Sequence, residues 1–204
     1  MAPLYYILIG MQNTAHHQSP LQTANFAHPH TNVKALGIGP GMSVADFGSG
    51  SGHYVLAIAE ALEGSGHVYA IDVQRDLLRR IHNEAMKRGI KNVQILWGDL
   101  ERPGGSKIAD HHLDRVLISN LLFQVEDKSA VLQEAARVLR PHGRLAIIDW
   151  SESYGGMGPV KKDVVTKDAA QKLAVAHGFE LDREFPAGAH HYGLLFMTPA
   201  NTRI

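Results

Sequence analysis

Apolar segments and amphipathic segments alternate along residues 44–150, and this alternation limits the folds that the chain can adopt. Short apolar runs predict strands at 44–47, 67–71, 93–96, 115–119 and 144–149. Apolar residues at helical spacing predict helices at 54–62, 75–88 and 129–139, the last of them capped by Ser129. Strands that alternate with helices predict a parallel sheet covered by helices on both faces.

The pattern changes after Trp150. A loop is expected at 151–163 and a helix at 166–177, followed by two strand-like segments at 180–185 and 192–197. The join between these two segments is too short for a crossover helix, so the pair must be antiparallel. The predicted fold is therefore an α/β three-layer sandwich whose seven-stranded, mainly parallel sheet has one antiparallel strand near the C-terminus.

The first 32 residues differ from the rest of the chain. Residues 12–32 are rich in polar side chains and lack hydrophobic periodicity, which predicts an irregular arm that could act as a lid. The apolar stretch at 4–9 is too short to span a bilayer and lacks the basic flank of a signal peptide. We expect one domain at 33–204, a cytoplasmic location and no membrane partner.

The composition excludes several kinds of chemistry. The chain of 204 residues has 20 basic and 20 acidic side chains, and this zero net charge gives no general attraction to nucleic acid, although a local basic patch stays open. It has no cysteine, which excludes disulfides, thiolate metal centres and cysteine nucleophiles. The 13 histidines match no metal-binding template, so we expect no metal site.

A glycine-rich turn, Asp46-Phe47-Gly48-Ser49-Gly50-Ser51-Gly52, follows the first predicted strand and opens a helix. Glycines permit a tight turn and let a ligand lie against main-chain N–H groups. The dinucleotide fingerprint G-x-G-x-x-G would need a glycine where His53 stands, and no Gly-Lys-Ser/Thr follows as in a phosphate-binding loop. The turn therefore predicts a nucleotide-like ligand held by a different motif.

The spacing of this turn resembles the nucleotide-binding motif of class I (seven-stranded) S-adenosylmethionine-dependent methyltransferases, and in particular the broad type 11 group. The resemblance extends over about residues 33–198. It continues in the strand that ends at Asp72, in Trp97-Gly98-Asp99-Leu100, and in the segments 113–120 and 134–145. Each feature alone is weak evidence for this family, whereas the occurrence of all of them in the family's order and spacing is specific.

The resemblance implies a Rossmann-like fold, with S-adenosylmethionine as methyl donor and S-adenosylhomocysteine as product. The acid at Asp72 would bind the ribose hydroxyls, Asp99 would contact the adenine amino group, and Leu100 would pack on the ring. The expected donor-binding residues are Asp46, Gly48, Ser49, Gly50, Gly52, Asp72, Val73, Gly98, Asp99, Leu100 and Asn120. Asp114, by contrast, stands at the start of a strand and is expected to be structural.

The acceptor is expected above the carboxyl ends of the central strands, where open α/β sheets bind ligands. This places Phe26, Phe123, Gln124 and Trp150 in a substrate pocket. The segment from Asn120 to Phe123 begins and ends like the Asn-Pro-Pro-aromatic motif of amino-group methyltransferases, but it lacks both prolines. No catalytic residue is therefore assigned.

The predicted function is methyl transfer from S-adenosylmethionine to a small molecule, with the acceptor itself undetermined. Two alternatives stay open. One is an RNA or protein methyltransferase of the same fold, which a basic stripe along residues 75–91 would favour. The other is a non-catalytic nucleotide-binding module.

Overall fold

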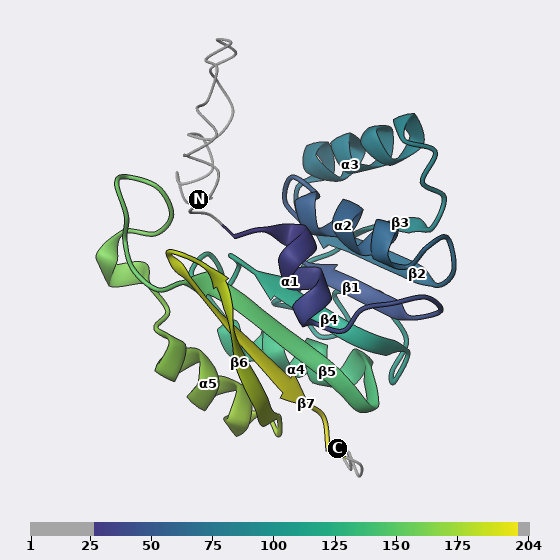
Figure 1. Cartoon of the computed structure of the whole chain (residues 1–204). Helices are drawn as coiled ribbons and strands as arrows, with labels where there is room; N and C mark the ends of the chain where they lie inside the picture. Colours follow the sequence, from purple (N-terminus) through teal and green to yellow (C-terminus); the bar gives the residue numbers. More distant parts are fainter. Residues whose placement is uncertain (1–26, 200–204) are drawn as a thin grey trace.

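Seven strands form one sheet in the computed structural model, which describes residues 27–199 (Figure 1). The strands are β1 (Ser43–Phe47), β2 (His67–Asp72), β3 (Val93–Trp97), β4 (Leu113–Ser119), β5 (Leu139–Trp150), β6 (Glu180–Gly188) and β7 (His191–Met197). They lie in the order β3-β2-β1-β4-β5-β7-β6. β7 runs antiparallel to β5 and β6, whereas the other strand pairs of this sheet are parallel, which confirms the predicted fold class.

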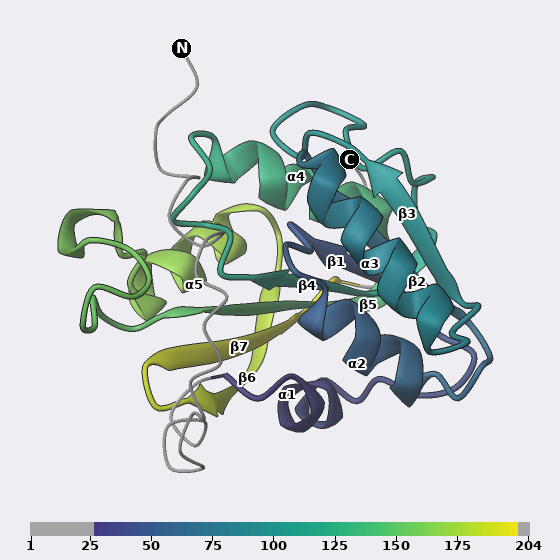
Figure 2. The same cartoon turned by 90° about the horizontal axis from the view of Figure 1, so that it is seen from above.

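Helices cover both faces of the sheet. They are α1 (Pro29–Ala35), α2 (His53–Ala61), α3 (Arg75–Lys87), α4 (Lys128–Val138) and α5 (Lys167–Ala176), with a short 3-10 helix at Lys161–Asp163. Figure 2 shows α1 and α2 on one side of the sheet and α4 and α5 on the other. Two clusters of buried apolar side chains fill the two interfaces. Alternate residues of each central strand therefore point into opposite layers.

Helix α1 is a difference from the prediction, because it begins at Pro29, inside the segment expected to be irregular. Proline suits the first turn of a helix, where its missing N–H needs no partner. The helix is held by Asn32, whose amide nitrogen donates to the Tyr54 hydroxyl at 2.8 Å and to the Ala187 carbonyl at 3.0 Å. Because these partners are distant in the sequence, no local hydrophobic pattern predicts the helix.

The predicted cap of α4 is also wrong. The side chain of Asp127, not Ser129, accepts a hydrogen bond from the Ala130 amide at 2.9 Å. The helix begins at Lys128, so Ser129 already lies inside its first turn. The Ser129 hydroxyl instead lies 2.6 Å from Nε2 of His177, beyond the end of α5, and links the two helices.

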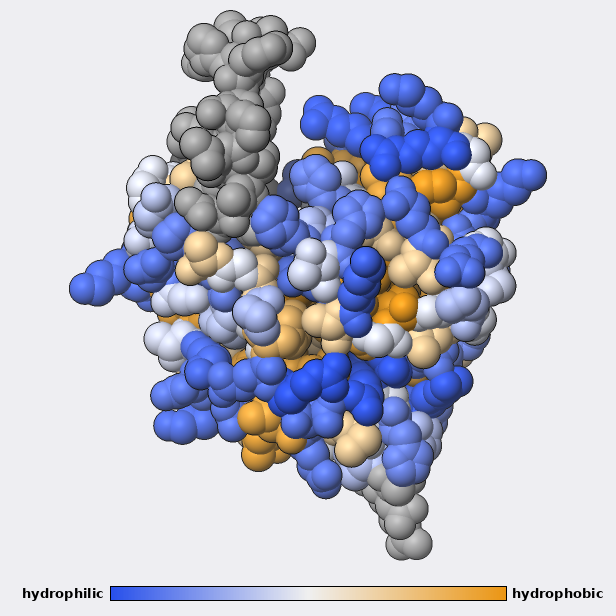
Figure 3. Space-filling model, viewed as in Figure 1, coloured by the Kyte–Doolittle hydropathy of each residue, from blue (hydrophilic) through white to orange (hydrophobic). Residues whose placement is uncertain are grey.

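The surface carries apolar side chains only in small, separate areas on the face shown in Figure 3. The large apolar residues that are exposed are Val73, Met86, Trp97, Tyr154, Met157, Val160 and Val175. None of the helices within residues 27–199 has the length and apolar character needed to cross a membrane.

Candidate functional site

The candidate site lies at the carboxyl ends of β1 and β4. In the sheet, β1 is paired with β2 on one side and with β4 on the other. After β1 the chain builds one half of the sheet with β2 and β3. It then returns to the other side of β1 and builds the second half of the sheet, starting with β4. Open α/β sheets bind ligands at such a point, because the loops diverge there and leave a crevice.

The glycine-rich turn follows β1 at this point, and its three glycines have different surroundings. A Cβ atom on Gly48 would lie 2.7 Å from Cδ1 of Leu121, and one on Gly52 would lie 2.6 Å from Cγ1 of Ile81. Both glycines also have positive φ angles, so larger residues would strain the turn. A Cβ atom on Gly50 would meet only the Gly48 carbonyl, at 3.9 Å. The turn is therefore open to a ligand at Gly50.

Asp72, at the end of β2, lies directly beside this opening. Its Oδ2 accepts a hydrogen bond from the Gly50 amide at 2.9 Å, and its Oδ1 accepts one from the Gln74 amide at 2.8 Å. These two bonds fix the carboxylate. A carboxylate has about four lone-pair sites, so acceptor capacity is left for two neighbouring hydroxyl groups of a ligand.

Asp46, the last residue but one of β1, is buried with 2% of its surface exposed. Burial, together with the negative charge of Asp72, raises the pKa of Asp46 to about 7. No hydrogen bond reaches its carboxyl group from any residue in the described range 27–199. A cationic ligand beside Asp46 would therefore stabilise the charged form of this acid.

The loop after β3 carries Asp99 and Leu100. The Asp99 carboxylate accepts hydrogen bonds from the Glu101 amide at 3.1 Å and from Nε of Arg102 at 3.0 Å. Leu100 is buried in the layer that contains α4 and α5. The start of this loop packs closely on a later part of it, since a Cβ atom on Gly98 would lie 2.1 Å from the Gly105 carbonyl oxygen.

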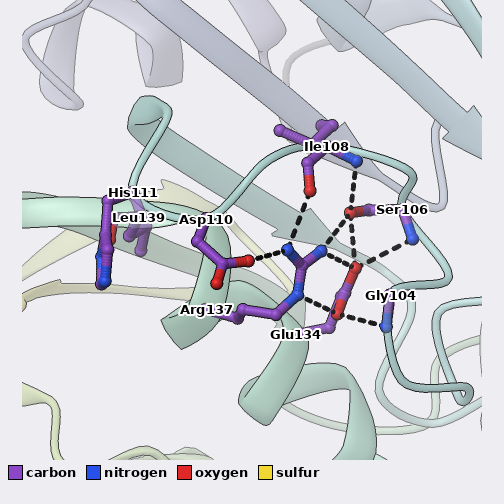
Figure 4. A network of polar contacts seen from close by, with 8 residues as sticks. All are labelled: Gly104, Ser106, Ile108, Asp110, His111, Glu134, Arg137 and Leu139. Atoms are coloured by element: carbon purple, nitrogen blue, oxygen red, sulfur yellow. Dashed lines mark hydrogen bonds and ion pairs between the residues drawn. The ribbon is translucent and has the colours of Figure 1, made fainter. Parts of the chain in front are cut away.

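A buried ion pair on α4 anchors the same loop (Figure 4). The Glu134 carboxylate accepts hydrogen bonds from the amides of Gly104 and Ser106, at 3.0 and 2.9 Å. It also pairs with Arg137, whose Nη1 in turn donates to the Ile108 carbonyl. Burial opposes ionisation of Glu134, but the hydrogen bonds from Arg137 and Ser106 outweigh it and lower its pKa. The network fixes the path of the loop that carries Asp99.

Sequence reasoning did not assign this anchor. The i,i+3 spacing of Glu134 and Arg137 indicates a helical ion pair. It gives no sign that Gly104 and Ser106, on another element, complete the network.

On the other side of β1, the turn after β4 carries Asn120. Its backbone amide donates to the Ile148 carbonyl at 2.9 Å, and its φ angle is +53°. Its side-chain oxygen is buried and has no hydrogen-bond partner among residues 27–199. A buried acceptor of this kind is costly unless a ligand or water supplies a donor.

Asp149 shapes the same turn from the neighbouring strand β5. Its Oδ2 accepts a hydrogen bond from the Leu122 amide at 3.2 Å, and its Oδ1 accepts one from the Trp150 amide at 2.8 Å. Burial raises the pKa of Asp149 to about 7. Asp149 thereby positions the turn that presents half-buried Phe123 and exposed Gln124.

Trp150 is covered rather than open. Its ring centroid lies 4.4 Å from that of His191, and a Cβ atom on Gly158 would lie 2.4 Å from the ring. The indole is thus held between β7 and the loop that follows β5. Phe26, the remaining residue predicted for the pocket, lies outside the described residues.

Two other features lie away from this edge. Asp114 accepts a hydrogen bond from the Ser43 amide at 2.8 Å and forms an ion pair with Arg140, so it is structural, as predicted. A cavity of about 650 Å³ opens beside α4 and α5, where Ala130, His177 and Phe179 are among its lining residues. None of its lining residues belongs to the glycine-rich turn.

Comparisons with known proteins agree with this geometry. Residues 38–188 match a family model described as "Methyltransferase domain". The fold is similar to that of a solved SAM-dependent methyltransferase from Aquifex aeolicus, with a TM-score of 0.78, 27% identity, and coverage of 88% of this chain and 93% of that one.

Two curated relatives are similar over part of their length. An arsenite methyltransferase from Halobacterium salinarum is 30% identical over 119 residues, which is 58% of this chain and 30% of the relative. A demethylmenaquinone methyltransferase from Listeria monocytogenes serotype 4a is 31% identical over 121 residues, which is 59% of this chain and 49% of the relative. The chain thus spans 30% of the length of the first relative and 49% of the length of the second.

Proposed function

Because this chain belongs to the S-adenosylmethionine-dependent methyltransferase family, we propose that it transfers a methyl group from S-adenosylmethionine to a small-molecule acceptor. One observation carries the proposal. The opening of the turn at Gly50 lies beside two acids, the fixed carboxylate of Asp72 and the buried Asp46. This arrangement suits a donor that combines ribose hydroxyls with positive charge.

The donor supplies a methyl group on a positively charged sulfur atom, so the enzyme mainly has to align the acceptor with it. In our assignment Asp72 binds the ribose hydroxyls, and Asp46 compensates the positive charge. Asn120 offers its unpartnered side-chain oxygen to the amino group of the donor. The remaining residues of the proposed donor site are Gly48, Ser49, Gly50, Gly52, Val73, Gly98, Asp99 and Leu100.

The size of the acceptor is inferred from the elements around the edge. Only a loop and one turn of 3-10 helix separate β5 from α5, over residues 151–166, so no large recognition element stands there. Arsenite and demethylmenaquinone, named for two relatives, are both small molecules. We propose Phe123, Gln124 and Trp150, together with Phe26, as the acceptor side. The cytoplasmic location stays a prediction.

A nucleic-acid or protein acceptor finds less support. The basic residues of α3 would provide its docking surface, yet Arg79 pairs with Asp76 on the same helix. Arg88 pairs with both Glu84 and Glu60. These exposed acids offset part of the stripe's positive charge, so a polyanion gains little attraction there.

Isothermal titration calorimetry with S-adenosylhomocysteine and with NAD tests the proposal. We expect saturable binding of S-adenosylhomocysteine and none of NAD, because the turn lacks the third glycine of the dinucleotide fingerprint. Absence of S-adenosylhomocysteine binding would overturn the proposed function.

A further inference from the structure

Polar side chains form a row across the layer between the sheet and helices α1 and α2. Asp46 points into this layer, as does Val44 two residues earlier on the same strand. Ser119 of β4 follows Leu117 into the same layer, and there it contacts the hydroxyl of Tyr54. The row begins at the proposed donor site and lies near the carboxyl edge of the sheet.

His191 lies at the far end of this row. It is paired in register with Trp150, and cross-strand partners in an antiparallel pair point to the same face. The preceding residue of β5 with the same orientation, Ile148, belongs to the α1–α2 layer, as does Leu195 of β7. His191 therefore faces the same layer as Asp46, beyond β4 and β5.

The imidazole of His191 is buried, with 6% of its residue surface exposed, and neither ring nitrogen has a hydrogen-bond partner within residues 27–199. The neighbouring His190 differs, since its Nδ1 lies 2.8 Å from a carboxylate oxygen of Glu152. Buried polar groups are rarely left unsatisfied in proteins. Two unpartnered nitrogens at a ligand-binding edge point to a ligand that supplies the missing partner.

The surroundings of His191 favour an uncharged ligand with an apolar body. The ring packs on the indole of Trp150. Burial and the adjacent His190 lower the pKa of His191 to about 4, so the imidazole is neutral at neutral pH. Asp149 is paired with Tyr192 and thus points to the opposite face, which leaves no carboxylate of β5 beside the ring. An ammonium group would be buried there without a counter-charge.

We propose that His191 binds the hydroxyl group of an uncharged, largely apolar acceptor by accepting its hydrogen bond, and so aligns the acceptor oxygen for methyl transfer. The proposal rests on the methyltransferase function proposed above and names its substrate class. The acceptor oxygen forms a bond to the methyl carbon while the carbon–sulfur bond breaks, and that electron pair stays on sulfur. The hydroxyl proton is lost to water, because an imidazole buried without a counter-charge holds it only weakly.

A pair of probes that differ only in the hydroxyl group tests the binding step. The full chain, saturated with S-adenosylhomocysteine, is titrated with 2-naphthol and with naphthalene. We expect 2-naphthol to bind about tenfold more tightly, the worth of one buried hydrogen bond. In His191→Phe the two probes should bind within about twofold of each other, whereas His82→Phe, at an exposed position of α3, should keep the preference.

The catalytic step is tested with S-adenosylmethionine and 2-naphthol as substrates. We expect His191→Phe to lower kcat/KM by about tenfold, because the hydrogen bond that aligns the acceptor is lost. His191→Gln should restore both the preference for 2-naphthol and most of kcat/KM, because its amide oxygen accepts the same hydrogen bond. A residue with a purely structural role would not be rescued in this way.

The inference fails if the wild-type chain binds the two probes equally or binds neither, or if His191→Phe keeps the preference. It fails separately from the proposed function, since each variant is first tested for S-adenosylhomocysteine affinity within about twofold of wild type. Loss of that affinity in the wild-type chain itself would overturn the methyltransferase proposal instead.

Discussion

At the scale of single residues, Asp72 is the sharpest test of the donor site. Asp72→Ala removes the carboxylate proposed to bind the ribose, and with it the hydrogen bonds that fix the Gly50 and Gln74 amides. We expect S-adenosylhomocysteine binding to weaken by about 1–3 kcal/mol, as measured by calorimetry. Asp76→Ala, at an exposed position on α3, should leave the affinity unchanged. Unchanged affinity in Asp72→Ala would remove the ribose assignment.

The raised pKa of Asp46 leads to a prediction about stability as well as binding. Its pKa is about 7 in the folded chain and 3.8 in a model peptide, so the folded state binds the proton more tightly than the unfolded state. The free energy of unfolding therefore falls as the pH rises from about 4 to about 7, and then stays level. Asp46→Asn removes this loss, and we expect it to stabilise the unliganded chain at pH 8 by a few kcal/mol.

Thermal unfolding at two pH values checks this expectation. The gain of Asp46→Asn should be present at pH 8 and absent at about pH 3, because below the unfolded pKa of 3.8 the carboxyl group is neutral in both states. The same variant should bind S-adenosylmethionine more weakly, since it cannot compensate positive charge. An equal gain at both pH values would show that packing, and not ionisation, stabilises the variant.

At the scale of elements, the anchor of the loop after β3 depends on Glu134. Glu134→Gln keeps the size of the side chain but breaks the charge pair with Arg137 and weakens the bonds to the Gly104 and Ser106 amides. We expect a loss of about 1–3 kcal/mol in urea unfolding, because the hydrogen bonds to the Gly104 and Ser106 amides weaken, although Arg137 keeps its ion pair with Asp110.

Glu184→Gln is the matched control for this experiment. Glu184 pairs with Lys167 at the surface, where about half of each side chain is exposed, so its loss should cost less than about 1 kcal/mol. Donor affinity should fall in Glu134→Gln but not in Glu184→Gln, because Glu134 anchors the loop after β3 that carries Asp99 and Glu184 does not. Equal stabilities of the two variants would argue against the anchor.

The elements also show what a sequence can and cannot predict. The central strands were predictable because β1, β2, β4 and β5 contain buried apolar runs, and Asp72 was predictable because a strand end places its side chain at the carboxyl edge of the sheet. Helix α1 and the Asp127 cap were not, since they depend on tertiary partners or on a one-residue boundary. His191 was given no role from the sequence, because its contact with Trp150 is set by the register of β5 and β7.

At the scale of the whole molecule, the strand order separates the two halves of the proposed reaction. The donor-side acids stand on β1 and β2, and Trp150 and His191 stand on β5 and β7, with β4 between the two groups. Asp46 lies in the same layer as His191, so the donor's positive charge and the acceptor would meet over β4. On the proposed assignment, donor binding would therefore be coupled to the protonation of Asp46.

This coupling leads to a prediction for the intact protein. At pH 6 most Asp46 side chains are protonated, because the pKa is about 7, and a bound cation would lower that pKa. S-adenosylmethionine binding should then release up to one proton at pH 6 and almost none at pH 8. Below pH 7, its affinity should increase by up to about tenfold for each unit by which the pH is raised. Calorimetry in two buffers of different ionisation enthalpy measures the released proton. Asp46→Asn should abolish the buffer dependence, and a buffer-independent enthalpy in the wild-type chain at pH 6 would place the donor's charge away from Asp46.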